Sequence, residues 1–422
     1  MPGISLLLGN TRKTERGEVC SWSHLVARAA PFALSRRSPV AAGGLLALIL
    51  PLAGWPQQIT REGSYWVQTV SGAVAVKTGG RIRISTRGPV TVSGGNAGQV
   101  EYDLTRKVRA RSPEEARRLL EKVSVAGRLQ GDVTSVKVIA ATSFGFGAAI
   151  LALRVPKAMR QIMIETYGGA VAASGLSGDL DALTGGGRIQ LDEIGGSVQA
   201  KTAGGEIQLG SVGGSVRCIS AGGPIRAGSI GGDARLETAG GDIVIRAVKG
   251  RVSAVTNGGG ILIGQAGATV AVNTAGGAIE VGSARGTVTA ESLGGPILVS
   301  AASGVHCETA GGAIRLENVS GNLRAATAMG NISASLAPSG AADSFLSTGS
   351  GDITVFVPSN LGIRIEAHND AAQSLRRIVS DFPDLTIRRQ GPVIVAEGVI
   401  NGGGPLLRLA GAGGTIYIRR QQ

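Results

Sequence analysis

The sequence predicts an all-β fold: a single-stranded parallel β-solenoid with coils of about 18 residues and two short strands per coil. Three observations predict it, namely a recurring hydroxyl residue, glycine steps half a cycle apart, and apolar columns after each glycine step. The recurring residues are Thr166, Thr184, Thr202, Ser220, Thr238, Thr256, Thr274, Ser292, Thr309, Thr327 and Thr348. One coil cannot bury its apolar face alone, so stacked coils must share a continuous core.

The two strands of each coil follow from apolar columns. The column after the first turn reads Ile189, Ile207, Ile225, Ile243, Ile261, Ile279, Ile297, Ile314, Ile332 and Ile353. The column after the second turn reads Val198, Val216, Ala234, Val252, Val270, Val288, Val305 and Leu323. Two residues beyond each member the chain is again apolar, while the residue between them varies. This alternation is typical of a strand with one buried face, and such coils stack about 4.8 Å apart.

The glycines and the Thr/Ser residues are assigned to the turns. Glycine at the corners is predicted to let the chain turn at positive φ, and the Thr/Ser ladder to cap the turns by side-chain hydrogen bonds along the stack. None of the Gly-Gly steps is followed by the Lys-Ser/Thr that a phosphate-binding loop requires. The glycines are therefore interpreted as structural.

Residues 1–60 are predicted to be a signal peptide or an N-terminal membrane anchor with a basic leader. Arg36 and Arg37 precede the apolar run Val40 to Gly54, which resembles a signal-peptide core and is short for a membrane span. We expect an exported protein that is periplasmic, on the cell surface, or anchored in the inner membrane facing outward. Cleavage would start the mature chain between residues 55 and 65.

The flanks of the repeat are predicted to cap it. We expect irregular strands and a cap over 64–160, regular coils over 161–357, and capping strands over 358–422. Ser112-Pro113-Glu114-Glu115 combines an N-cap, a proline at the first helical position and a capping-box Glu, which predicts one short helix near residues 113–123. Caps are needed because the open ends of a solenoid would present bare strand edges.

The net charge of +13 is unevenly distributed. Basic residues gather in the leader and between residues 77 and 128, whereas the repeat is close to neutral. Aromatic residues make up only 3% of the chain, so the stacking platforms for single-stranded nucleic acid are missing and no nucleic-acid partner is expected. An acidic envelope polymer or a phospholipid surface could contact the 77–128 region.

The residues do not predict a catalytic, cofactor or metal site. The three histidines, His24, His306 and His368, have no partner at metal-ligand spacing. Cys218 and Cys307 occupy the same inward position five coils apart, too far for a disulfide, and are expected to be buried hydrophobes. Calcium-binding β-rolls have Gly and Asp where this repeat has apolar residues. The densest acidic group falls at turns and comprises Asp179, Asp181, Asp192 and Glu193.

Several motifs resemble the bacterial β-strand-repeat family known as adhesin-like, a domain of unknown function. They are Leu153-Arg154-Val155-Pro156, Ile164-Glu165-Thr166-Tyr167-Gly168-Gly169, the repeated Thr-Ala-Gly-Gly-x-Ile, Ser350-Gly351-Asp352-Ile353, Asn401-Gly402-Gly403-Gly404-Pro405-Leu406 and Gly414-Thr415-Ile416-Tyr417-Ile418. The resemblance covers roughly residues 64–420. It implies an exported, envelope-associated parallel β-solenoid without established catalytic residues.

Three functional hypotheses follow. The first is an exported, non-enzymatic adhesin-like scaffold that binds an envelope polymer, a membrane surface or another surface protein. Its candidate binding patch is one outer column, Arg217, Arg235, His306 and Arg324. The second is a filament-type structural β-helix that self-associates through its ends. The third is a carbohydrate-active β-helix enzyme, whose activity would require Asp179 or Asp192.

Overall fold

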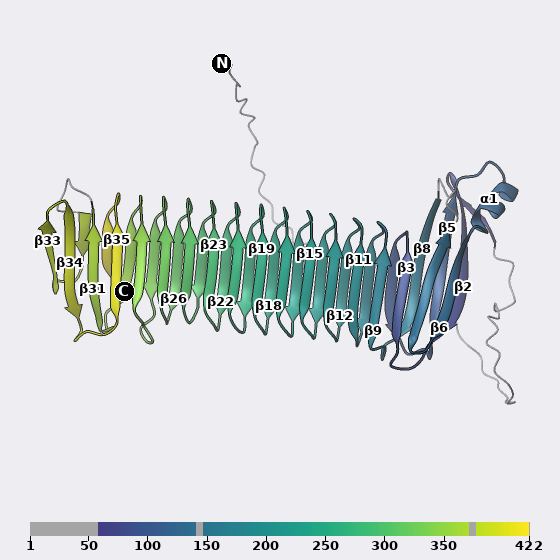
Figure 1. The fold of residues 1–422 in the computed structure, drawn as a ribbon, viewed down its shortest axis with the longest axis horizontal. Coiled ribbons are helices and arrows are strands. Elements are labelled where there is room, and N and C mark those ends of the chain that lie inside the picture. Colours follow the sequence, from purple (N-terminus) through teal and green to yellow (C-terminus); the bar gives the residue numbers. More distant parts are fainter. Residues whose placement is uncertain (1–57, 141–146, 371–376, 422) are drawn as a thin grey trace, which may run out of the picture. The chain divides into compact units, whose positions relative to one another are not determined.

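The computed structural model describes residues 58–140, 147–370 and 377–421, and within them the fold is the predicted parallel β-solenoid (Figure 1). The described residues form 36 strands and one short helix. Almost all of the predicted leader, including the run Val40 to Gly54, lies outside the described residues. In the described part of the chain no helix is both long enough and apolar enough to cross a membrane.

Each regular coil contributes one strand to each of two sheets. The first sheet contains β10 (Val171–Leu176), β12 (Ile189–Ile194), β14 (Ile207–Val212), β16 (Ile225–Ile230), β18 (Ile243–Val248), β20 (Ile261–Ala266), β22 (Ile279–Ala284), β24 (Ile297–Ala301), β26 (Ile314–Val319), β28 (Ile332–Leu336) and β30 (Ile353–Pro358). The second contains β9 (Gln161–Thr166), β11 (Asp179–Thr184), β13 (Val198–Thr202), β15 (Val216–Ser220), β17 (Ala234–Thr238), β19 (Val252–Thr256), β21 (Val270–Thr274), β23 (Val288–Ser292), β25 (Val305–Thr309), β27 (Leu323–Thr327) and β29 (Ser344–Thr348).

The register between coils follows the predicted columns. Ile207 lies opposite Ile225 in the first sheet, and Val216 lies opposite Ala234 in the second. Both columns are buried and form one continuous core. The column prediction is therefore confirmed, because only residues on the inward face of each strand escape water as the coils stack.

The hydroxyl ladder is also confirmed. Thr238 Oγ1 donates a hydrogen bond to the carbonyl oxygen of Gly223 in the preceding coil at 2.9 Å and accepts one from the N–H of Gly241 at 3.4 Å. The carbonyl of Gly241 then accepts from Thr256 Oγ1 at 2.9 Å, so the bonds continue from coil to coil. At each turn the hydroxyl thus supplies a hydrogen-bond partner to one backbone carbonyl and one backbone N–H, groups that would be costly to bury unpaired.

The reason for glycine at the repeat turns differs from the prediction. Positive φ was expected there, but the glycines of the repeated turns adopt ordinary φ values; within the repeat Gly175, inside β10, and Gly340, in the longer β28–β29 connection, have φ of 68° and 79°. The second glycine of the first-turn pairs is needed because consecutive coils approach closely there, whereas a Cβ added to the first glycine, as at Gly204 or Gly222, would meet nothing within 4 Å. A Cβ on Gly205 would lie 2.0 Å from the carbonyl oxygen of Gly187, and one on Gly223 would lie 2.2 Å from that of Gly205. Only a residue without a side chain fits.

The N-terminal end stacks out of chain order. β3 (Arg81–Thr86) pairs in parallel with β9 on one side and β7 (Val133–Ala140) on the other. β4 (Val90–Gly95) likewise lies between β10 and β8 (Gly147–Pro156). Antiparallel strands complete the cap: β5 (Gln99–Val108), β2 (Tyr65–Ala75) and β1 (Thr60–Glu62) follow β8, and β6 (Val123–Gln130) pairs with β7.

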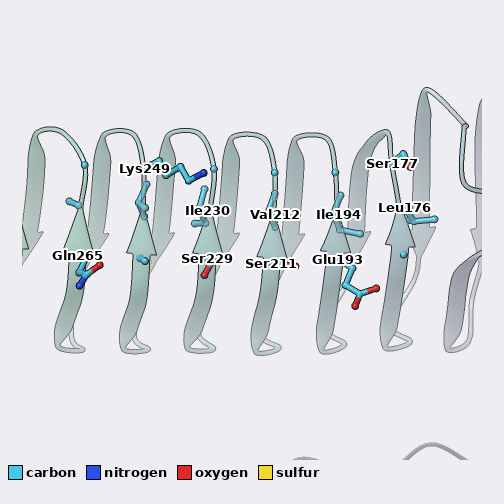
Figure 2. A pocket seen from close by; sticks show the side chains of 18 of the residues that line it. Leu176, Ser177, Glu193, Ile194, Ser211, Val212, Ser229, Ile230, Lys249 and Gln265 are labelled. Atoms are coloured by element: carbon cyan, nitrogen blue, oxygen red, sulfur yellow. The ribbon is translucent and has the colours of Figure 1, made fainter.

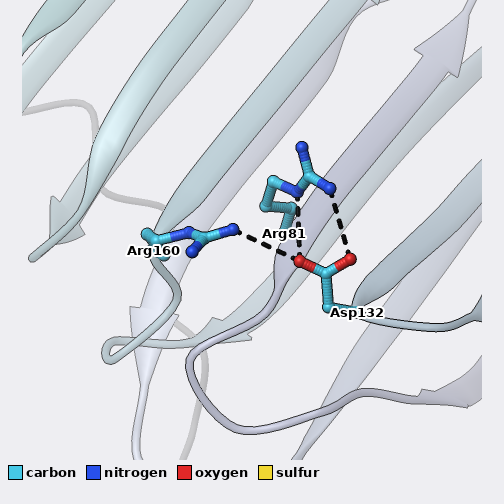
Figure 3. Close-up of polar contacts among 3 residues, drawn as sticks. All are labelled: Arg81, Asp132 and Arg160. Atoms are coloured by element: carbon cyan, nitrogen blue, oxygen red, sulfur yellow. Dashed lines mark hydrogen bonds and ion pairs between the residues drawn. The ribbon is translucent and has the colours of Figure 1, made fainter.

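One carboxylate joins the three interleaved strands of this end (Figure 3). Asp132, just before β7, accepts hydrogen bonds from Arg81 Nη2 at 3.2 Å and Arg81 Nε at 3.3 Å. It also accepts one from Arg160 Nη2, just before β9, at 3.2 Å. The hydrogen bonds from Arg81 and the positive charge of both arginines lower the pKa of Asp132 below its ordinary value.

The predicted helix is confirmed as α1 (Pro113–Leu120). Ser112 is the N-cap, its hydroxyl accepts the N–H of Glu115 at 3.2 Å, and the Glu115 carboxylate accepts the N–H of Arg111 at 2.8 Å. The helix ends beside a buried arginine of β5, Arg106, which donates to the carbonyl of Leu120 at 2.8 Å. A cation at the last carbonyls stabilises a helix end.

The C-terminal end repeats the interleaving. β35 (Leu406–Gly411) lies between β29 and β31 (Ile363–Asn369), and β36 (Ile416–Gln421) pairs with both β30 and β32 (Ile378–Ser380). The antiparallel strands β34 (Val393–Ile400) and β33 (Leu385–Gln390) cover the last coil. Asp381 again joins strands, since it accepts from Arg419 Nη1 at 2.8 Å and from the N–H of Arg420 at 3.2 Å.

Candidate functional site

A groove crosses the carboxyl ends of seven neighbouring strands of the first sheet, β10 to β22. Its volume is about 1280 Å³. Figure 2 shows the strands side by side, with Ile194, Val212 and Ile230 at equivalent positions near the strand ends. The groove therefore runs along the stacking direction, and each coil presents the same backbone positions to it.

The groove is hollow because several consecutive members of one column have no side chain. The first residue after each strand forms this column, and three consecutive members are glycine, Gly195, Gly213 and Gly231. A Cβ on Gly213 would lie 2.4 Å from the carbonyl oxygen of Gly195, so a side chain in this coil would require the neighbouring coil to shift. Sequence reasoning assigned these glycines to turns and missed the hollow. The sequence feature that could have indicated the hollow is the run of glycines at three consecutive positions of a column that holds lysine and arginine in later coils.

The lining combines apolar and small polar side chains. The last strand residue of each coil, such as Val212 or Ile230, is buried beneath the surface. The residue before it is exposed and polar in several coils, as in Ser211, Ser229 and Gln265. The groove thus offers hydroxyl groups in some coils and one amide side chain, with Ala247 interrupting the series, and its lining contains no aromatic ring.

The charges of the groove are mostly positive. Lys157 lies at one end, while Lys249 and Arg285 lie in later coils, and Glu193 is the one carboxylate among the lining residues. At the usual strand spacing Lys157 and Lys249 are about 24 Å apart along the stack, and Lys249 and Arg285 about 10 Å. All three cations are exposed, and none forms an ion pair with another of the residues that the structure describes. They are free to meet an anion.

The acidic group identified in the sequence has structural partners. Asp192 Oδ1 accepts the N–H groups of Glu193 and Ser211, each at 2.9 Å, and thereby holds Glu193 in a left-handed conformation with φ of 52°. Asp179 Oδ1 accepts the N–H of Ser197 at 2.8 Å, and Asp181 accepts from the side chain of Gln161 at 2.6 Å. Asp179 and Asp192 thus accept backbone N–H groups of the next coil, whereas Asp181 pairs with a side chain. Within the described ranges no cluster of His, Cys, Asp or Glu could hold a metal ion.

The arginine and histidine column of the sequence prediction lies on the second sheet, away from the ends of the strands that form the groove. Arg217 lies opposite Arg235, and His306 lies opposite Arg324. The two pairs share one column but are separated by three residues without charge, Ser253, Ala271 and Thr289. The column therefore holds two separate basic pairs.

Two of these side chains have acidic neighbours on their own strands. Arg235 Nε donates to Glu237 at 2.6 Å, and His306 Nε2 lies 3.1 Å from Glu308. These carboxylates offset part of the positive charge of each pair. The column is consequently less available to an anionic ligand than the groove cations are.

The cysteines are buried and unpaired, in agreement with the sequence prediction. Burial raises the pKa of the Cys218 thiol and of the Cys307 thiol, because a thiolate loses its hydration inside the core. Neither thiol is therefore disposed to act as a nucleophile.

No protein-family model and no curated protein match the sequence. The chain resembles solved structures of candidate adhesins. A candidate cell adhesion protein from Clostridium sporogenes is 7% identical, with a TM-score of 0.18, and the match covers 84% of this chain and 100% of that one. A candidate adhesin from Parabacteroides distasonis is 12% identical, with a TM-score of 0.26 and coverage of 68% and 96%. A candidate lipid-binding protein from the same organism is 12% identical, with a TM-score of 0.25 and coverage of 69% and 97%.

Proposed function

We propose that this chain is an exported, non-enzymatic, adhesin-like scaffold that holds an extended acidic polymer of the cell envelope in the groove. The observation that carries the proposal is the set of unpaired cations, Lys157, Lys249 and Arg285, placed along a hollow that follows the stack across seven strands. The adhesin-like names of the similar structures agree with a binding role.

The shape of the groove favours a linear ligand. Its lining positions repeat with every coil, at intervals of about 4.8 Å, so a polymer that lies along the stack meets a polar side chain in several coils and the cations at wider intervals. A small molecule would use only a fraction of these contacts. Weak contacts at several sites on one ligand add to a useful affinity because each later contact forms intramolecularly.

The chemistry of the groove favours an acidic ligand that binds without stacking its sugar rings on aromatic side chains. The lining has three cations against one carboxylate and lacks aromatic rings, so affinity must come from ionic contacts and hydrogen bonds. Exposed ionic contacts are individually weak and are screened by salt. Binding should therefore be strongest at low ionic strength.

A matched pair of polymers tests the proposal with the full chain. Carboxymethyl cellulose is linear and acidic, and hydroxyethyl cellulose has the same backbone without charge. We expect the acidic polymer to bind in calorimetry at low salt and the neutral one to bind at least tenfold more weakly. Lys249→Glu with Arg285→Glu should weaken binding of the acidic polymer roughly tenfold, because two attractive contacts become repulsive.

A second double variant distinguishes the groove from the column on the second sheet. Arg217→Glu with Arg235→Glu reverses the same amount of charge outside the groove and should leave the affinity unchanged. If that variant loses binding while the groove variant keeps it, the site lies on the second sheet. Shortening of the polymer by the full chain, lost in Asp179→Asn or Asp192→Asn, would instead favour a carbohydrate-active enzyme.

A further inference from the structure

A basic surface that also carries aromatic rings covers the N-terminal cap, remote in sequence from the groove. It comprises α1, the β1–β2 turn and the end of β5, and we call it the cap surface. Its exposed cations are Arg61, Arg109, Arg111, Arg117, Arg118 and Lys122, and its rings are Tyr65 and Trp66. Figure 1 shows α1 at the tips of β2 and β5.

The cap surface is built as one unit. Ala116 and Leu120 of α1 form a small buried cluster with Val108, and Ile59 and Trp66 pack against it. The indole Nε1 of Trp66 donates to the carbonyl of Ala110 at 3.1 Å, which ties the β2 end to the segment before the helix. The polar face of α1 is left outside this cluster.

Two arginines lie over the two rings. The guanidinium carbon of Arg109 lies 4.7 Å from the Tyr65 ring centroid, and that of Arg61 lies 5.7 Å from the Trp66 centroid. Both rings are half-buried, and both arginines are exposed. Rings with an apolar body and a polar tip, next to arginine, are enriched where proteins meet the headgroup region of a bilayer.

Much of the positive charge of the cap surface is not neutralised. Between residues 105 and 123 the chain has seven basic and three acidic residues. Lys107 pairs with Glu62 at 3.0 Å, Arg106 is buried, and Glu115 is held by the backbone N–H of Arg111. Among the described residues, the six exposed cations form no ion pair.

We propose that the cap surface docks on the headgroups of anionic phospholipids. Charge complementarity and the flanking rings favour a lipid surface over a soluble anion, because a soluble anion would not use the rings. The position in the chain agrees, since the apolar run Val40 to Gly54 ends four residues before Gln58, the first described residue. A retained run would keep the cap surface close to the bilayer.

The test mixes the full chain with one of two kinds of vesicle. The neutral vesicles contain phosphatidylcholine alone, and the anionic vesicles contain phosphatidylcholine with about one third phosphatidylglycerol. Hydrogen exchange followed by mass spectrometry reports on the amides of α1 and its flanks, so insertion of the apolar run does not itself produce the signal. We expect exchange in α1 to be several-fold slower on the anionic vesicles. The protection should disappear in high salt, because screening removes the attraction.

Two variants with matched charge removal locate the effect. Arg117→Gln with Arg118→Gln should abolish the slower exchange, whereas Arg388→Gln with Arg389→Gln, in β33 of the opposite cap, should retain it. If the first variant unfolds α1, it is replaced by Arg111→Gln with Lys122→Gln. Both of these residues lie outside the helix. Equal exchange on both vesicles, or protection that survives both variants of the cap surface, would overturn the proposal. Failure of the polymer experiment would leave it untouched, since the groove is separate.

Discussion

At the residue scale, small polar side chains form hydrogen bonds with backbone N–H and C=O groups at the corners of the coils, where strand pairing does not reach. Thr238 satisfies one backbone acceptor and one backbone donor in two successive coils, and Asp192 satisfies two donors. These groups are buried or held close to the neighbouring coil, where an unpaired backbone group is costly. The recurrence of Thr/Ser in the sequence is therefore a consequence of hydrogen-bond requirements at the turn.

Thr238→Val should destabilise the chain by roughly 1–3 kcal/mol, because it keeps the side-chain shape but leaves the carbonyl of Gly223 and the N–H of Gly241 without their side-chain partner. Denaturant unfolding followed by circular dichroism measures the change. Thr289→Val is the matched control, since Thr289 occupies an outer position of β23 and should cost little. Equal loss in both variants would contradict a structural role for the ladder.

At the element scale, each end of the solenoid is closed by strands inserted out of chain order. The coil β3–β4 lies between segments that follow it in sequence, and β35–β36, from the end of the described chain, lies between earlier segments. A carboxylate joins the interleaved strands at both ends, Asp132 at one and Asp381 at the other. Outermost strands are short or carry charged residues, as in β1 and β33, which opposes pairing with a second molecule.

Acid should loosen the N-terminal end through Asp132. Its pKa is lowered in the folded state, so its stabilising contribution is present above the pKa of an unfolded aspartate, about 3.9, and is lost as the pH falls through the lower folded value. We expect the melting temperature of the native chain to exceed that of Asp132→Asn at pH 6 and the difference to vanish in strong acid. Asp384→Asn serves as a control for removing an exposed carboxylate. A difference that persists unchanged at pH 2 would contradict the ionic role.

At the scale of the whole described unit, the regular part behaves as a one-dimensional stack, because the inter-coil pairing of each regular strand is with its two neighbours in the sheet. The groove is a property of this stack. It exists because neighbouring coils present the same positions to the same side, and its charges are set by which coils carry lysine or arginine after the strand.

Deletion of one complete coil, residues 261–278, should leave a cooperatively folding chain. The deletion joins Gly260 to Ile279, and Ile279 occupies the same column as Ile261, so every later strand stays in its sheet. Deletion of half a coil, residues 261–269, would place the following strands on the wrong sheet and should prevent cooperative thermal unfolding. Circular dichroism melts of both variants measure this. If the two deletion variants showed equally cooperative melting curves, the assignment of each strand to its sheet would not depend on the 18-residue period.

Local periodicity in the sequence was enough to predict the coils, their buried columns, the hydroxyl ladder and α1. Each of these depends on residues at most about eighteen positions apart, such as Thr238 and Gly223, or Ser112 and Glu115. In the flanks, the strands β5, β6 and β34 were not predicted individually. The N–H and C=O requirements of a turn or a helix end act over short distances along the chain.

Only the tertiary structure decided the interleaved ends, the groove and the distribution of exposed charge. β3 pairs with β9 some eighty residues later, and no repeat period encodes which distant edge a strand will meet. The turn glycines could not reveal their role in close stacking, because that role depends on the carbonyls of the next coil. The shared column of Arg217 and His306 was predictable, and its division into two pairs follows from the same repeat period; only the side-chain contacts of Arg235 with Glu237 and of His306 with Glu308 required the structure.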